Sequence, residues 1–243
     1  QEEVTMTDSW VTTHDARPFN DRVVHEKLTI VKNRRKKMST RGLYGFRKDG
    51  IDKCTYNHSD SYPEQLGRRI LTFCKNNTTE SLSDFFERIV LVNGDSIPTK
   101  DQIQYLSDAY FEDGEDWYSA LMSAQKEDED CYWYDVFRNV QGNFVAYQKL
   151  LDSEDAVYMT NDISFIRNSL YCQYAYIVNL DEGVLECYVG FQKKKQKENR
   201  YGTRKRNCYY PCRLVMQIPL SVISSAEIDT LLEQMIGTQN ISA

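Results

Sequence analysis

Apolar and polar residues alternate along two neighbouring segments near the start of the chain, Thr40–Lys48 and Ile51–His58. This period of two predicts a pair of β-strands. Asp49-Gly50 separates the two segments, and because both positions of a two-residue hairpin turn favour positive φ, this dipeptide predicts a β-hairpin. In that register Arg47 faces Asp52, an opposite-charge pair that supports the alignment.

The pattern then changes to helical spacing. Ser61 and Glu64 form a capping-box pattern around Pro63, which predicts a helix running to Cys74. Apolar residues three and four positions apart predict further helices downstream. These cover Ser81–Val90, Thr99–Tyr110 and Trp117–Gln125.

The C-terminal half returns to segments rich in Tyr, Val and Ile. Strands are predicted at Leu170–Leu180, Val184–Gln192 and Tyr209–Leu220, followed by a closing helix at Ser225–Ile236. A short loop at 181–183 joins the first two strands as a hairpin. Together these elements predict an α+β fold, with a mainly antiparallel sheet built from the N-terminal hairpin and the C-terminal strands, covered by a helical layer.

Composition narrows the class of protein. The chain has 243 residues, of which 41% are apolar and 12% aromatic, enough to build a core. No run approaches the roughly 18 apolar residues of a membrane span, so no membrane partner is expected. Seven cysteines without regular spacing argue against a disulfide-stapled secreted fold. We therefore expect a cytoplasmic protein.

Charge divides the chain unevenly. Residues 1–37 carry 8 Lys+Arg and 6 Asp+Glu, whereas the remainder carries 22 and 30. Apolar residues in this first segment occur only singly or in pairs, too few to offset the entropy cost of folding. The basic run before Met38 fits translation of a purine-rich ribosome-binding site, so residues 1–37 are interpreted as a non-native or disordered leader. The alternative is a basic arm that binds an acidic partner. Residues 38–243 are expected to form a single α+β domain.

Extending the hairpin register past the turn-proximal residues yields a candidate catalytic cluster. Arg41 would lie opposite His58 and Ser39 opposite Asp60, with all four side chains on one face. His58 is the only histidine after Met38. Removal of Met38 would leave Ser39 with a free α-amine of pKa about 8, able to act as base for its own hydroxyl. This is the chemistry of N-terminal nucleophile hydrolases.

The same residues also fit a purely structural role. The run from Asn57 to Ser61 is ordinary turn and capping chemistry, and Arg41 could pair with Asp60 as a bridge. Asn57 could serve as an oxyanion donor only if the strand ended early, because its parity places it on the opposite face.

Two charged segments suggest partners. Residues 101–135 hold 11 acidic residues and one lysine, which fits a solvated helical face. The stretch Lys193–Arg206 holds eight basic residues and one acidic residue, and is predicted to be a long exposed loop that could touch phosphate. Tyr201 is its only aromatic residue for stacking on a base, and the net charge of −6 argues against nucleic acid.

No cofactor or metal is expected. A single histidine after Met38 and the lack of paired CxxC motifs exclude the usual zinc patterns. No Walker loop, GxGxxG or GxSxG motif is present. Cys131, Cys172 and Cys187 lie in apolar runs and are expected in the core.

Several motifs together resemble a family of bacterial and phage proteins. They are Met38-Ser39-Thr40-Arg41-Gly42, Tyr56-Asn57-His58-Ser59-Asp60-Ser61-Tyr62-Pro63 with Leu66-Gly67, the segment Tyr174–Asp181, and Tyr209-Tyr210-Pro211. The resemblance covers most of residues 38–220 and supports Met38 as the start, but it implies no activity because none is established for the family. In that family the residue after the initial Met is Gly as well as Cys or Ser, and Gly has no nucleophile. A shared role would then depend on Thr40, Arg41, His58 and Asp60, or the family would share no chemistry at all.

Two functions follow as hypotheses. The first is an Ntn-like amide or acyl hydrolase, with Ser39 as nucleophile, Arg41 holding a substrate carboxylate, and His58 and Asp60 moving protons. Thr40, Asn57 and Tyr62 would contact the substrate. The second is a non-catalytic binding protein, such as a phage or mobile-element accessory factor, whose charged surfaces engage a protein or nucleic-acid partner.

Overall fold

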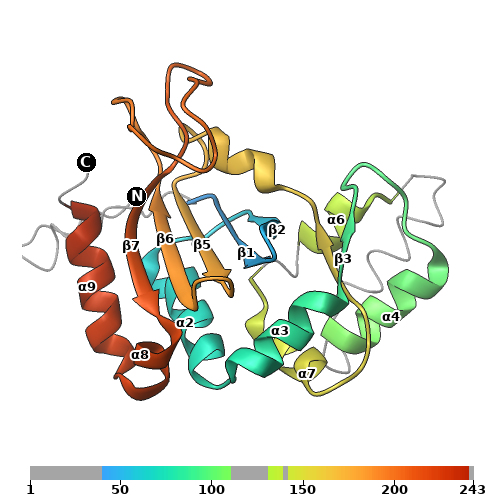
Figure 1. The fold of residues 1–243 in the computed structure, drawn as a ribbon. Helices are drawn as coiled ribbons and strands as arrows, with labels where there is room; N and C mark the ends of the chain where they lie inside the picture. Colours follow the sequence, from blue (N-terminus) through green and yellow to red (C-terminus); the bar gives the residue numbers. More distant parts are fainter. Residues whose placement is uncertain (1–39, 111–130, 139–141, 241–243) are drawn as a thin grey trace, which may run out of the picture. The chain divides into compact units, whose positions relative to one another are not determined.

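Five strands form a mixed sheet in the order β2-β1-β5-β6-β7 (Figure 1). The structure is a computed structural model that describes residues 40–110, 131–138 and 142–240. Every neighbouring pair is antiparallel except the central pair β1–β5, which is parallel. The α+β class and the mainly antiparallel sheet are therefore confirmed. The strands are β1 (Gly42–Lys48), β2 (Ile51–Asn57), β5 (Tyr174–Asn179), β6 (Val184–Val189) and β7 (Arg213–Pro219).

The hairpin β1–β2 forms in the predicted register. Arg47 lies opposite Asp52, and their side chains make an ion pair of 3.0 Å. Asp49 and Gly50 have φ values of 53° and 72°, the left-handed turn conformation that this dipeptide favours. The Asp181 carboxylate accepts both turn amides, at 2.6 and 3.0 Å, and so fastens the turn to the β5–β6 connection.

One face of the sheet packs on helices. Tyr44, Phe46, Tyr176, Val178 and Leu185 alternate onto this face and are buried. The helices that supply the other side of this core are α2 (Arg68–Lys75), α3 (Thr79–Arg88), α7 (Phe144–Leu151), α8 (Leu220–Ser225) and α9 (Ile228–Asn240). Burial on both faces explains why the strand β5 reads as a continuous apolar run.

The opposite face has its own smaller core. Leu43, Ala175 and Ile177 point into it from β1 and β5. It is covered by the short helical turn η2 (Ile163–Arg167) and by the long connection between β6 and β7. That connection is therefore part of the fold and not merely attached to it.

A second, two-stranded parallel sheet lies beside the main one. It pairs β3 (Ile89–Val92) with β4 (Val157–Thr160). The helices α4 (Lys100–Tyr110) and α6 (Trp133–Arg138) accompany it (Figure 1). Thr99 and Gln102 cap α4 reciprocally, at 2.9 and 3.2 Å.

The predicted capping box at Ser61 is wrong. The helical segment opens with a wide turn, η1 (Pro63–Gly67), whose N-cap is Tyr62 and which has no side-chain cap. Ser61 is fully buried, and its hydroxyl instead accepts a hydrogen bond of 2.7 Å from Asn57 Nδ2. The competing interaction with Asn57 therefore removes Ser61 from the helix end.

Other predictions differ in extent. α3 and α4 match their predicted helices closely, whereas the closing helix begins at Ile228 after the separate helix α8. The last strand begins at Arg213, because residues 209–212 belong to the preceding loop. β3, β4, α6 and α7 were not predicted. The expected helix at Trp117–Gln125 and the leader at 1–37 lie outside the described residues.

Candidate ligand-binding site

The hairpin ends before the proposed catalytic cluster is complete. The last paired residues are Gly42 and Asn57. Beyond them Ser61 N donates to Thr40 O at 3.1 Å, and Asp60 turns the chain with a φ of 54°. The register therefore does not continue to His58 and Asp60. Ser39 lies outside the described residues.

Arg41 and His58 both lie near the Tyr56 hydroxyl. Tyr56 Oη is 3.3 Å from His58 Nδ1, and the Arg41 guanidinium stacks over the Tyr171 ring at 4.9 Å. Burial raises the pKa of Tyr56, and the nearby Arg41 charge opposes that shift only in part. Tyr56 is thus a neutral hydroxyl between a cation and an imidazole.

The remaining predicted residues separate into two places. Asp60 is exposed, and its carbonyl accepts from Leu66 N at 3.2 Å. Thr40 and Asn57 are buried beside Ser61: Thr40 O accepts from Ser61 N at 3.1 Å, and Asn57 Nδ2 donates to Ser61 Oγ at 2.7 Å. Tyr62 leaves the cluster and lines a pocket, with its ring centroid 6.0 Å from that of Tyr174.

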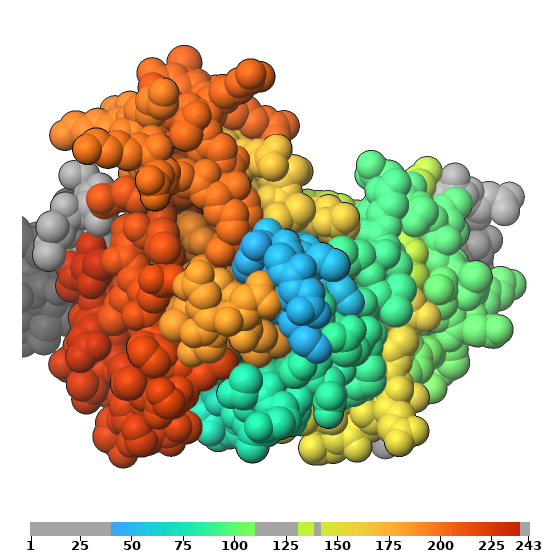
Figure 2. Space-filling model, viewed as in Figure 1, coloured from blue at the N-terminus to red at the C-terminus, as the bar shows by residue number. Residues whose placement is uncertain are grey.

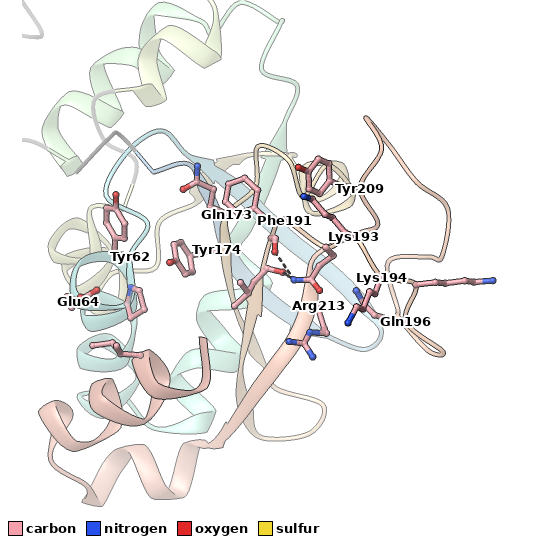
Figure 3. Close-up of a pocket in the computed structure, with 16 residues that line it drawn as sticks. Tyr62, Glu64, Gln173, Tyr174, Phe191, Lys193, Lys194, Gln196, Tyr209 and Arg213 are labelled. Atoms are coloured by element: carbon pink, nitrogen blue, oxygen red, sulfur yellow. Dashed lines mark hydrogen bonds between the residues drawn. The ribbon is translucent and has the colours of Figure 1, made fainter. Parts of the chain in front are cut away.

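That pocket, of about 1010 Å³, lies at the end of β5, β6 and β7. We call it the aromatic–basic pocket. Tyr62, Tyr174 and Gln173 lie on one side of it, and Lys193, Gln196 and Arg213 on the other (Figure 3). Its full lining is Tyr62, Pro63, Glu64, Gln173, Tyr174, Val189–Gln196, Tyr209, Arg213 and Ile236. Its volume is at the upper end of the range of ligand sites, about 300–1,000 Å³.

A rigid turn presents Phe191 at the pocket. Phe191 is 50% exposed and has a φ of 56°, a conformation that is strained for a bulky residue. Its backbone N–H donates to Ser169 O at 2.7 Å, and the neighbouring Gly190 N–H donates to Gln173 O at 2.8 Å. Gln192 completes the turn by donating from Nε2 to Gly190 O at 2.7 Å. The ring of Phe191 meets that of Tyr209 edge-on at 6.3 Å.

Positive charge dominates the pocket. Three consecutive lysines, Lys193–Lys195, and Arg213 line it against one carboxylate, that of Glu64. Arg213 Nε is buried and has no hydrogen-bond partner within the described part of the chain. A buried donor left in this state is uncommon.

The basic loop Lys193–Arg206 is anchored by hydrogen bonds from Gln196 to Pro211 O and from Asn199 to Cys212 O, and by an ion pair to a buried carboxylate. Arg200 meets the Glu186 carboxylate with both terminal nitrogens, with Nη1 to Oε1 at 2.9 Å. Glu186 is only 1% exposed and also accepts from Asn179 and Tyr188, each at 2.8 Å. Such a bidentate pair fixes direction as well as distance. The loop projects beyond the rest of the surface in Figure 2 (orange).

Tyr201 does not serve as the predicted stacking residue. It is 5% exposed and packs on Tyr188 at 5.6 Å, while its hydroxyl accepts from Arg200 at 2.8 Å. The aromatic surface near the basic loop comes instead from Phe191 and Tyr209, outside the loop itself. Neither Phe191 nor Tyr209 is among the site residues predicted from the sequence.

Metal and thiol chemistry find no support in the described residues. No group of three or more His, Cys, Asp or Glu side chains there could hold a metal ion. All seven cysteines are free and six are buried. The prediction that Cys131, Cys172 and Cys187 lie in the core is confirmed. Burial raises the pKa of the Cys187 thiol, which keeps it protonated. No helix in the described ranges has the length and apolar character needed to cross a membrane.

We compared the chain with protein-family models, curated proteins and solved structures. No protein-family model matches the chain, and searches of curated proteins and of solved structures gave no significant match.

Proposed function

We propose that this protein is a non-catalytic binding protein for single-stranded nucleic acid. The observation that carries the proposal is the position of the basic loop, which is anchored by the Glu186–Arg200 pair beside a pocket lined by the exposed ring of Phe191 and by half-buried tyrosines. Single-strand binding proteins combine a positively charged track for the backbone with aromatic side chains for the bases.

Most cations of the basic loop can contact phosphates. Of its eight cations, Arg200 is committed to Glu186, which leaves seven others. Arg204, Lys205 and Arg206 line a second hollow of about 570 Å³ further along the loop. The positive surface thus continues from the aromatic–basic pocket along the loop, as an extended polyanion requires.

A single strand fits better than a duplex. The rings at the pocket can stack only on bases that are unpaired and turned outward, which duplexes do not offer. The chain's net charge of −6 does not oppose this, because local charge steers a strand toward the loop and away from the acidic remainder.

The proposal is tested by fluorescence anisotropy with a labelled oligonucleotide of about 12 nucleotides. Wild-type protein is expected to bind it, with an affinity that falls as salt rises. Lys193→Gln/Lys194→Gln is expected to bind about tenfold more weakly and to lower the salt slope by ~1.4. Lys100→Gln/Lys149→Gln removes the same charge from exposed helix positions and is expected to bind as wild type. Equal losses in both variants, or equal binding of a duplex, would contradict the proposal.

A second candidate, an Ntn-like amide or acyl hydrolase, is supported by the position of Arg41 and His58 around the Tyr56 hydroxyl. Thr40, the residue that follows Ser39 in the chain, is held in place because its carbonyl accepts from Ser61 N at 3.1 Å. A protein whose translation starts at Met38 is expected to expose Ser39 once the methionine is removed. A serine-reactive acylating probe should then label Ser39. One added glycine before Ser39 should abolish labelling, as detected by peptide mass spectrometry. Labelling that survives the extension would exclude this mechanism.

A further inference from the structure

We infer that the aromatic–basic pocket binds one nucleotide unit, with the phosphate on Arg213 and the base against the aromatic rings. This inference rests on the proposed function and names the ligand class of its pocket. The shared chemistry is a nucleoside monophosphate, whether free in solution or carried within a strand.

The phosphate side of the pocket is defined by Arg213. This residue begins β7 and lies opposite Val189 in the β6–β7 ladder, so its backbone is fixed by the sheet. Its Nε is buried without an acceptor among the residues described. A guanidinium presents several N–H donors in a planar fork that matches phosphate oxygens. Lys193, on the same side of the pocket, adds a second cation (Figure 3).

The base side is defined by Phe191. Its backbone is strained, with a φ of 56°. Its side chain is half exposed, so burial of the ring in the core does not compensate for the energy of that strain. Strain of this kind persists where the surroundings impose it, and it concentrates at binding sites. Here the turn through Gly190 and Gln192 imposes it and directs the ring outward. An exposed aromatic ring on a rigid support loses little entropy when a base stacks on it.

The rest of the lining suits a base and sugar. Tyr62 and Tyr174 form a tilted aromatic pair facing the cationic side (Figure 3). The Gln173 amide, which also lines the pocket, offers one donor and one acceptor for a base edge. Glu64, the only carboxylate of the lining, gives a hydroxyl-bearing sugar an acceptor.

The experiment is calorimetric titration with AMP, and with adenosine as the uncharged match. Wild-type protein is expected to prefer AMP by about tenfold or more. Arg213→Gln should remove that preference while leaving adenosine binding unchanged, and Arg68→Gln, an exposed control, should keep it. Phe191→Gly should weaken both ligands about tenfold. Its unfolding temperature should stay level or rise, because glycine tolerates positive φ.

The outcomes separate the two proposals. If the 12-mer binds but AMP neither binds nor competes, and Phe191→Gly leaves 12-mer affinity unchanged, the pocket inference is wrong and the proposed function stands. If AMP binds but affinity does not grow with strand length, the pocket serves free nucleotides and strand binding is wrong. Loss of AMP binding in Phe191→Gly together with a lowered unfolding temperature would point to a structural role for the ring and would overturn the inference.

Discussion

Glu186→Gln is expected to destabilise the fold by about 3 kcal/mol and to weaken strand binding, because the basic loop loses its anchor. The variant leaves Arg200 beside an amide that cannot balance its charge. The magnitude is at the lower end for a buried pair, since the Arg200 side chain is 28% exposed and can reach water. Urea denaturation at pH 7, followed by tyrosine fluorescence and circular dichroism, measures the loss.

The same variant has a pH signature. Burial alone would raise the pKa of Glu186, but hydrogen bonds from Arg200, Asn179 and Tyr188 outweigh it and leave the pKa lowered. A lowered pKa contributes stability above the unfolded value, about 4.3, and that contribution disappears as pH falls through the folded value. The difference between wild type and variant should therefore be constant above about pH 5 and shrink below it. Glu87→Gln, at an exposed ion pair, serves as the control and should leave the midpoint unchanged.

Gly190→Ala is expected to cost about 3 kcal/mol or more and to abolish binding at the aromatic–basic pocket. An ideal Cβ at this position would lie 2.1 Å from Cys172 O and 2.7 Å from Ser169 O. Both are backbone atoms of the segment that holds the Phe191 turn, so relief requires that turn to move. Thermal unfolding and AMP titration of the same samples measure the two effects.

Gly237→Ala provides the matched control. Gly237 lies within α9, and no atom lies within 4 Å of its ideal Cβ. Alanine there should stabilise the protein by roughly 0.5–1 kcal/mol, because it restricts the unfolded chain and favours the helix. A Gly190→Ala protein as stable as wild type would show that the turn yields easily, and would remove the argument that it is rigid.

Local chemistry made part of this structure predictable. The Asp49-Gly50 turn determines the hairpin register because both residues accept positive φ and the strands on either side alternate cleanly. The predicted cap at Ser61 failed for an equally local reason, since the Asn57 side chain competes for its hydroxyl. Local patterns are reliable where no neighbouring group offers a better partner.

The pocket could not be predicted, because its residues come from distant parts of the chain. Tyr174, Phe191 and Arg213 come together through the antiparallel ladders of β5, β6 and β7. Tyr62 joins them only because β1 pairs in parallel with β5, and no short-range pattern encodes that pairing. The left-handed backbone of Phe191 is likewise imposed by Ser169 and Gln173, which precede it by about 20 residues. Two features of the pocket are visible in sequence: the basic loop, and Tyr62, which is among the residues expected to contact a substrate.

The parallel contact of β1 with β5 has a consequence for synthesis. Gly42 pairs with Tyr174, about 130 residues later, so the apolar hairpin leaves the ribosome long before its partner strand exists. During that interval the hairpin is an unpaired edge open to aggregation, and closing so long a loop makes folding slow. Productive expression should therefore depend on holdase chaperones, and yields should respond more to translation speed and temperature than the folded protein's stability would suggest.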